Sequence, residues 1–114
     1  MSSLENTRCD MVRRLFAAYI AQHPDLVDPL LTQDFTFSSP RDDHLDKKRY
    51  FEHCWPKEKA FRAIHIEHLV ADGDDVIVGY RAEKMDGGSF RNVELIRFAG
   101  DRIAEVNVYF GRNV

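Results

Sequence analysis

The stretch that decides the fold of this chain is residues 76–110, VIVGYRAEKMDGGSFRNVELIRFAGDRIAEVNVYF. Polar and apolar side chains alternate along most of it, which is typical of strands with one buried face. With the similar segment before it, the alternating runs are residues 61–71, 76–84, 90–98 and 103–110. The short breaks between them contain Gly73-Asp74, Gly87-Gly88 and Gly100-Asp101. Breaks of this kind favour hairpin turns, so the sequence predicts an antiparallel, strongly twisted meander of four strands.

The two-residue period also decides which side chains share a face of each strand. The more apolar faces, which we expect helices to cover, hold Val76, Val78, Tyr80, Ala82 and Lys84, then Phe90, Asn92, Glu94, Ile96 and Phe98, then Val106, Val108 and Phe110. The opposite face still carries Ile77, Val93, Leu95 and Tyr109, which makes it too apolar for a surface in water. A homodimer through this outer sheet face is the simplest arrangement that would cover it.

The first half of the chain has helical periodicity instead. Apolar residues recur at helical spacing through residues 4–20, and Ser2 with Glu5 fits a capping box at the start of this helix. A shorter helix is predicted after the His-Pro pair that ends the first one, and either Asp25 or Asp28 is its expected cap.

A strand and a third helix complete this half. Residues 35–38 alternate as a strand, and the polar residues 41–44 after it are interpreted as a solvated loop. The third helix is predicted to begin at Asp46 and to end at Pro56. The expected fold is therefore α+β, with three N-terminal helices packed on a strongly curved, mostly antiparallel sheet that forms a cone-shaped α+β barrel.

Length and composition limit the possible classes of protein. The 114 residues are enough for one domain, residues 1–114, and 19 acidic against 16 basic side chains give a net charge of -3. This balance argues against nucleic acid or an anionic membrane as a partner, and no apolar run is long enough to span a bilayer. No signal peptide is recognisable. The two cysteines, Cys9 and Cys54, are too few for a disulfide scaffold, so we expect reduced thiols in a cytoplasmic protein.

The order of elements resembles that of the nuclear-transport-factor-two-like, SnoaL-like and ketosteroid-isomerase-like proteins. The resemblance covers nearly the whole chain and includes Asp34-Phe35-Thr36-Phe37-Ser38-Ser39-Pro40 and the closing Val106-Asn107-Val108-Tyr109-Phe110-Gly111. It implies a cone-shaped fold whose cavity is open at one end. It also implies that the protein works without a cofactor. Because that cone hosts isomerases, cyclases, hydrolases, dehydratases and non-catalytic binders, the resemblance does not assign a reaction.

The resemblance also implies positions for a site. Tyr19 falls on the oxyanion-hole tyrosine of the ketosteroid isomerases, and Glu94 falls where they have a protonated aspartic acid. Two such donors would face a developing enolate. Ser39 stands where those enzymes carry their aspartate base, and a serine hydroxyl is a poor base at neutral pH, so their steroid isomerisation is not expected here. The substitute bases to consider are Asp34, Asp42, His44 and His53.

Each of these residues also has a structural interpretation. Glu94 is either an acid with a raised pKa or one half of an internal ion pair with Lys84, which lies on the same face of the neighbouring strand. Tyr19 is either a catalytic donor or a buried tyrosine anchored to a nearby acceptor. His65 and His68 should point to opposite faces of their strand unless a bulge lies between them, so no metal site is predicted.

The sequence thus predicts a pocket for a small, mainly apolar molecule. Tyr19 and Glu94 are its candidate catalytic residues, and its other expected lining residues are Phe37, Ser39, Phe51, Trp55, Tyr80, Asn92 and Phe110. Two functions remain open. One is a cofactor-free isomerase, cyclase or dehydratase acting on a carbonyl compound, and the other is a non-catalytic module that binds a ligand or a protein partner.

Overall fold

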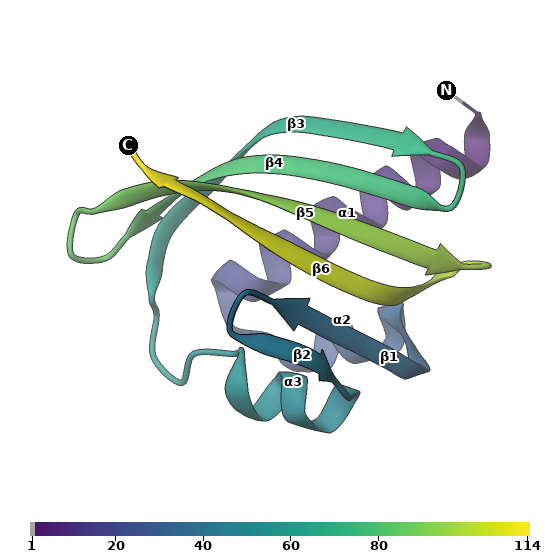
Figure 1. Ribbon diagram of the computed structural model, residues 1–114, viewed down its shortest axis with the longest axis horizontal. Coiled ribbons are helices and arrows are strands. Elements are labelled where there is room, and N and C mark those ends of the chain that lie inside the picture. The colour runs from purple at the N-terminus through teal and green to yellow at the C-terminus, as the bar shows by residue number, and fades with distance from the viewer. Residues whose placement is uncertain (1) are drawn as a thin grey trace.

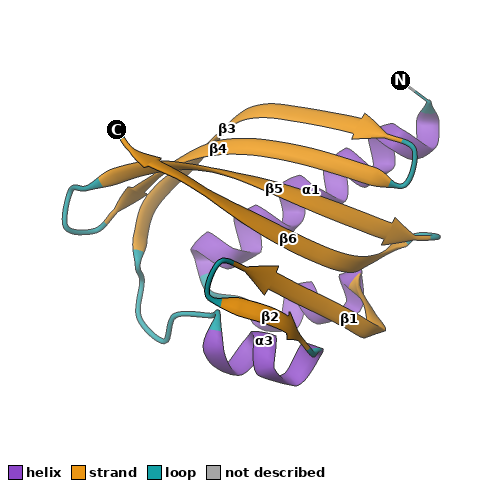
Figure 2. Ribbon diagram, viewed as in Figure 1, coloured by secondary structure: helices purple, strands orange, loops and turns teal. Residues whose placement is uncertain are grey.

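The computed structural model describes residues 2–114 as helices packed against one sheet (Figures 1 and 2). The helices are α1 (Ser3–Ala21), α2 (Pro24–Val27) and α3 (Lys47–His53), and a single 3-10 turn, η1 (Asp28–Leu30), follows α2. The strands are β1 (Leu31–Ser39), β2 (Asp42–Leu45), β3 (Phe61–Asp72), β4 (Asp75–Lys84), β5 (Ser89–Ala99) and β6 (Arg102–Asn113). The α+β class and the three helices are as the sequence predicts.

Two of the three helices begin at the predicted caps. The capping box of α1 is present, because Ser2 Oγ accepts from the Glu5 amide at 3.1 Å and Glu5 Oε1 accepts from the Ser2 amide at 3.0 Å. Asp46 Oδ1 caps α3 by accepting from the Arg49 amide at 2.9 Å. The prediction for α2 is wrong, because neither aspartate caps it. The cap is His23, which makes no side-chain bond, and the proline after it needs no amide partner.

The six strands lie in the order β2-β1-β6-β5-β4-β3. The predicted meander from β3 to β6 is antiparallel throughout, whereas β1 pairs with β6 in parallel, so the sheet is mixed. The sheet is curved, but β2 and β3 remain its free edges, so the expected barrel is not closed. The solvated loop expected at residues 41–44 is also wrong, since β2 pairs with β1 there. An edge strand needs backbone pairing on one side only and tolerates polar side chains.

The core lies between α1 and the inner face of the sheet (Figure 2). Val12 of α1, Val78 of β4 and Ile96 of β5 have no exposed surface, so alternation predicts the buried strand faces correctly over most of their length, whereas Lys84 and Phe110 of the same predicted faces are exposed. Buried apolar surface of this kind is the main stabilising contribution to the fold. No helix within residues 2–114 has the length and apolar character needed to cross a bilayer.

One charged side chain, Arg8 of α1, is buried at the end of this core, and the sequence reasoning missed it. Its Nη1 donates to the Gly73 carbonyl at 2.9 Å and to Asp74 Oδ1 at 3.0 Å, and its Nη2 donates to the Gly100 carbonyl at 2.8 Å. The guanidinium also lies over the Phe98 ring. Arg8 therefore ties α1 to the β3–β4 and β5–β6 turns at once.

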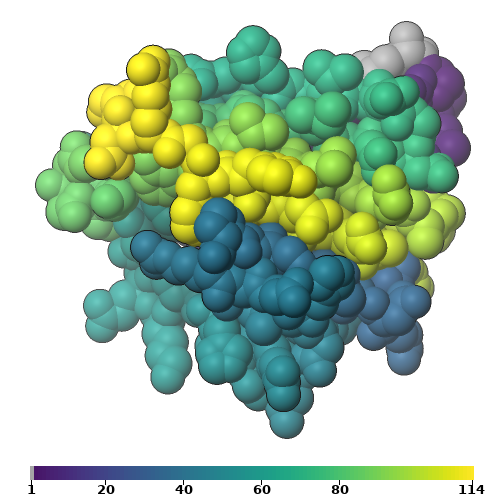
Figure 3. All heavy atoms as spheres, viewed as in Figure 1, coloured from purple at the N-terminus to yellow at the C-terminus, as the bar shows by residue number. Residues whose placement is uncertain are grey.

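The outer face of β3–β6 carries no helix on the side shown in Figure 3. Its exposed apolar side chains are Val70, Ile77, Val93 and Tyr109. Its arginines are paired within the chain, with Arg81 on Glu83, Arg91 on Glu67 and Arg97 on Asp75. The homodimer through this face stays a prediction.

The two histidines of β3 both belong to this outer face. A bulge between Ile66 and His68 shifts the register, so that His65 pairs with Arg81 and His68 with Gly79, which are two residues apart on β4. The expectation that the two rings point to opposite faces is therefore wrong, because the strand contains a bulge between the two histidines, the one exception to that expectation. Within residues 2–114, no group of three histidine, cysteine, aspartate or glutamate side chains is arranged to hold a metal ion.

Candidate functional site

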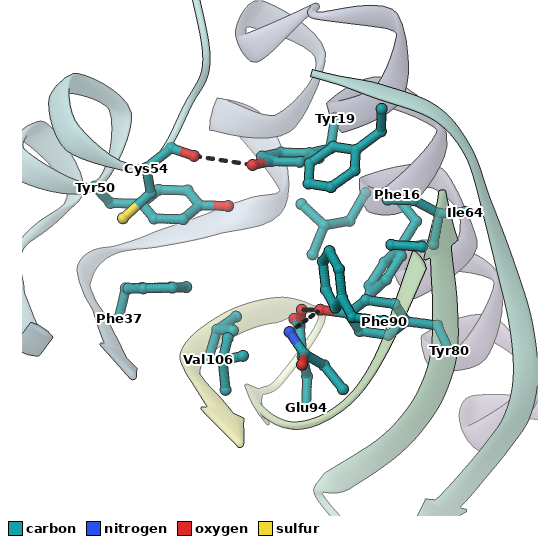
Figure 4. A pocket seen from close by; sticks show the side chains of 15 residues that line it. Phe16, Tyr19, Phe37, Tyr50, Cys54, Ile64, Tyr80, Phe90, Glu94 and Val106 are labelled. Carbon is teal, nitrogen blue, oxygen red and sulfur yellow. Dashed lines mark hydrogen bonds between the residues drawn. The ribbon is translucent and has the colours of Figure 1, made fainter. Parts of the chain in front are cut away.

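A cavity of about 180 Å³ lies between the C-terminal half of α1, α3 and the inner face of the sheet (Figure 4). Its walls are mostly apolar and aromatic. The lining residues are Leu15, Phe16, Tyr19, Phe37, Tyr50, Cys54, Phe61, Ile64, Tyr80, Ala82, Phe90, Asn92, Glu94, Val106 and Val108. An apolar chamber with a few polar groups is the usual form of a small-molecule site.

The polar groups of β4 and β5 form one hydrogen-bonded chain at the cavity wall (Figure 4). The Gly111 amide donates to Asn92 Oδ1 at 3.1 Å, which leaves Asn92 Nδ2 to donate to Tyr80 Oη at 3.4 Å. The Tyr80 hydroxyl in turn donates to Glu94 Oε2 at 2.6 Å. Because every donor in this chain points toward Glu94, a proton carried by Glu94 belongs on its other oxygen, Oε1.

Burial decides the charge of Glu94. Loss of hydration in the apolar chamber raises the pKa of Glu94 from its ordinary 4.5 to about 7, and the hydrogen bond from Tyr80 opposes part of this rise. The ion pair with Lys84 that would hold the carboxyl ionised is not formed. Lys84 Nζ lies 5.9 Å from the centre of the Phe90 ring instead. Glu94 therefore exchanges its proton close to neutral pH.

The other titratable side chains of the cavity stay neutral at that pH. Burial raises the pKa of Tyr19 to about 12 and the pKa of the Cys54 thiol to about 11. Burial also raises the pKa values of Tyr50 and Tyr80 well above the usual range of a phenol. Among the lining residues, Glu94 alone can give up and take back a proton near pH 7.

Tyr19 lines the cavity with its ring but directs its hydroxyl elsewhere. The hydroxyl donates to the Cys54 carbonyl at 3.1 Å (Figure 4), which is free because Cys54 is the C-cap of α3. The phenol bonded to Glu94 is Tyr80, not Tyr19. Tyr19 and Glu94 therefore line the same cavity, but they do not lie together as two hydrogen-bond donors to one ligand oxygen.

Of the other predicted pocket residues, Phe37, Tyr80 and Asn92 line the cavity, and Ser39, Phe51, Trp55 and Phe110 do not. Ser39 lies in the β1–β2 hairpin, where its Oγ is 3.2 Å from Asp42 Oδ2. Phe51 and Trp55 pack on each other, with ring centres 5.7 Å apart, on α3 and the turn after it. The Phe110 side chain is 49% exposed.

The four substitute bases also lie away from the chamber. Asp34, His44 and His53 are exposed, and Asp42 is the partner of Ser39 in the hairpin. Of the four, only Asp34 has a buried neighbour in the sequence, Phe35.

Tyr50 is the lining residue whose role sequence reasoning missed. Its helical spacing places it on the buried face of α3, and its side chain is indeed only 5% exposed. Its hydroxyl points into the cavity (Figure 4), which periodicity cannot predict.

Comparisons with solved structures establish the fold. An NTF2-like protein of unknown function from Cytophaga hutchinsonii is 23% identical, with 92% of this chain and 89% of that chain covered and a TM-score of 0.77. A protein from Jannaschia, provisionally named a SnoaL-like polyketide cyclase, is 16% identical, with coverages of 95% and 88% and a TM-score of 0.81. An LEH-like epoxide hydrolase from M. tuberculosis is 17% identical, with coverages of 93% and 84% and a TM-score of 0.76.

Sequence comparison gives the family. No curated protein matches the chain. The model of the SnoaL-like domain matches residues 12–106, which include the second half of α1, every cavity-lining residue except Val108, and most of the sheet. With the curved mixed sheet and the apolar chamber described above, this match shows that the chain belongs to the SnoaL-like domain family.

Proposed function

We propose that this chain binds a small, mainly apolar carbonyl compound in a cone formed by the helices and the curved sheet, and that Glu94 moves a proton on that compound without a cofactor. The observation that carries this proposal is a single carboxyl with a pKa of about 7 in the wall of an apolar cavity. Catalytic acids and bases work best when their pKa lies near the working pH.

One carboxyl suffices for a proton shift. The ionised Glu94 would take a proton from the carbon beside the carbonyl onto Oε1, which leaves an enolate, and would return that proton to another carbon of the same molecule. The Tyr80 hydroxyl would hold Oε2 throughout. This sequence of steps fits an isomerase, and an acid of the same kind serves a cyclase or a dehydratase.

The size of the chamber limits the substrate. An apolar cavity of about 150 Å³ accommodates one benzene ring, so a volume of about 180 Å³ fits one ring with small substituents. A four-ring steroid does not fit. The names of two compared proteins, a polyketide cyclase and an epoxide hydrolase, support an enzyme on this fold but do not assign the reaction.

The test uses a one-ring ketone. Wild type should exchange the α-hydrogens of cyclohexanone into D₂O and should convert 3-cyclohexenone to its conjugated isomer, which absorbs in the ultraviolet. Both rates should rise with pH through about 7, and Glu94→Gln should abolish them. The matched control is Glu58→Gln, which changes an exposed carboxyl in the α3–β3 connection.

The alternative is a non-catalytic ligand-binding module. It is favoured by the absence, among the cavity-lining residues, of a second group that titrates near neutral pH. Binding of cyclohexanone without any exchange or isomerisation in the wild type would establish it and would refute the enzyme proposal.

We also propose that the outer sheet face pairs with a second copy of the chain. Its apolar residues Val70, Ile77 and Val93 are exposed, and its arginines already have intrachain partners, so two such faces meet without unpaired positive charge. Wild type should sediment as a dimer at micromolar concentration and Val93→Asp as a monomer. A monomeric wild type would refute this proposal.

A further inference from the structure

Tyr50 is held rigidly at the wall of the cavity. It lies on α3, and its ring packs between Phe35 and Phe37 of β1, with ring centres 5.0 and 5.1 Å apart, and against Phe51 at 5.2 Å. Only 5% of its surface is exposed. The ring therefore has one orientation, and that orientation aims the hydroxyl at the chamber (Figure 4).

The Tyr50 hydroxyl has no hydrogen-bond partner within residues 2–114. The indole N–H of Trp55 lies close enough to the phenol oxygen to oppose part of the rise in its pKa, although it does not meet the geometry of a full hydrogen bond. An indole N–H is only a donor, so it cannot take the phenol proton in any case. Burial raises the pKa of Tyr50, so the group stays a neutral phenol with its proton available.

The hydroxyl groups of the other two tyrosines in the cavity already donate hydrogen bonds to groups of the protein. Tyr19 donates to the Cys54 carbonyl, and Tyr80 donates to Glu94. Tyr50 is therefore the one phenol of the lining whose donor remains for a ligand. Buried polar groups are nearly always hydrogen-bonded, so an unused donor aimed into an apolar chamber indicates an acceptor on what fills it.

We propose that the Tyr50 hydroxyl donates a hydrogen bond to a second oxygen of the ligand. The ligand is then a one-ring compound with two oxygen functions, a carbonyl whose neighbouring carbon faces Glu94 and a second oxygen at Tyr50, which is the class of cyclic hydroxyketones and diones. This inference rests on the function proposed above and adds a requirement to it, because a plain ketone whose neighbouring carbon lies at Glu94 offers no second oxygen to Tyr50.

The test compares cyclohexanone with 3-hydroxycyclohexanone and 4-hydroxycyclohexanone, which add the second oxygen at two spacings. Binding is measured by NMR titration near pH 6, where most of Glu94 is protonated. Wild type should bind at least one hydroxyketone about 5- to 20-fold more tightly than cyclohexanone, and Tyr50→Phe should remove this preference while it leaves cyclohexanone affinity within about twofold. Tyr109→Phe is the matched control and should retain the preference, because it removes an exposed phenol hydroxyl on the outer face of the sheet, away from the cavity.

A second measurement needs no ligand. Because the Tyr50 hydroxyl makes no bond in the protein, Tyr50→Phe should melt at the wild-type temperature or above it. A marked fall in melting temperature would assign the hydroxyl to a structural bond and would overturn the inference.

The binding results separate the two proposals. If Tyr50→Phe lowers the affinity for all three compounds equally, or for none of them, the proposed role of Tyr50 is refuted. The proposal that the protein binds ketones is not affected by either result. Failure of wild type to bind any of the three probes refutes the carbonyl-binding function, and the inference falls with it.

Discussion

Replacing Glu94 by glutamine should stabilise the protein at high pH and leave it nearly unchanged at low pH. The carboxyl has a pKa of about 7 in the folded chain against an ordinary 4.5. Because the folded state holds the proton more tightly, the contribution of Glu94 to stability is fully present below pH 4.5 and is lost as the pH rises through 7. A gap of about two and a half pH units corresponds to about 3 kcal/mol of unfolding free energy.

Glutamine cannot ionise, keeps the shape of the side chain and still accepts from the Tyr80 hydroxyl. The free energy of unfolding of Glu94→Gln should therefore exceed that of wild type by up to about 3 kcal/mol near pH 9 and by little near pH 5. The assay is urea denaturation at several pH values, followed by the fluorescence of the single tryptophan. The exposed-site control Glu58→Gln should show a constant difference from wild type. A constant difference for Glu94→Gln as well would refute the assigned burial of its charge.

Three further predictions concern other parts of the molecule. Gly111→Ala should destabilise by about 3 kcal/mol or more, because its Cβ would lie 2.1 Å from the Arg91 carbonyl oxygen. Gly79→Ala, whose Cβ would meet its nearest atom at 3.6 Å, should be nearly neutral in the same urea titration, and similar losses for both would refute the steric argument. Arg8→Met should lower stability by about 3 kcal/mol and accelerate amide exchange in the two turns that it contacts; protected turns would contradict this. The Cys54 thiol should react with iodoacetamide near pH 7.5 about 100-fold more slowly than a free cysteine, as followed by mass spectrometry, and a rate like that of the free thiol would show that it is not buried.

The sequence predicts the meander well because alternation is a local signal. Val78 and Ile96 are fully buried on the expected face, and β3 to β6 follow each other as hairpins. The strand β2 carries no such signal, because its polar residues pair through backbone at an edge. The parallel pairing of β1 with β6 joins segments that are far apart in sequence, so no local pattern predicts it.

The site is predictable to the same extent. Tyr80, Asn92 and Glu94 share one face by alternation, and all three line the cavity. Alternation also places Phe110 on that face, yet its side chain is 49% exposed, and the guanidinium of Arg41, in the turn between β1 and β2, lies 5.6 Å from the centre of its ring. The hydrogen-bond partner of a hydroxyl cannot be predicted in this way. The Tyr19 hydroxyl, for example, donates to the Cys54 carbonyl, which is available only because α3 ends there.

The two ends of α1 are held to the rest of the protein by different sets of hydrogen bonds. The buried guanidinium of Arg8 holds one end through three hydrogen bonds. The other end meets the segment after α3 through two single bonds, from Tyr19 to the Cys54 carbonyl and from Gln22 to the Pro56 carbonyl. Because fewer hydrogen bonds hold the Tyr19 end of α1, we expect a ligand to enter and leave the cavity beside the α3–β3 connection, with no change in the pairing of the strands.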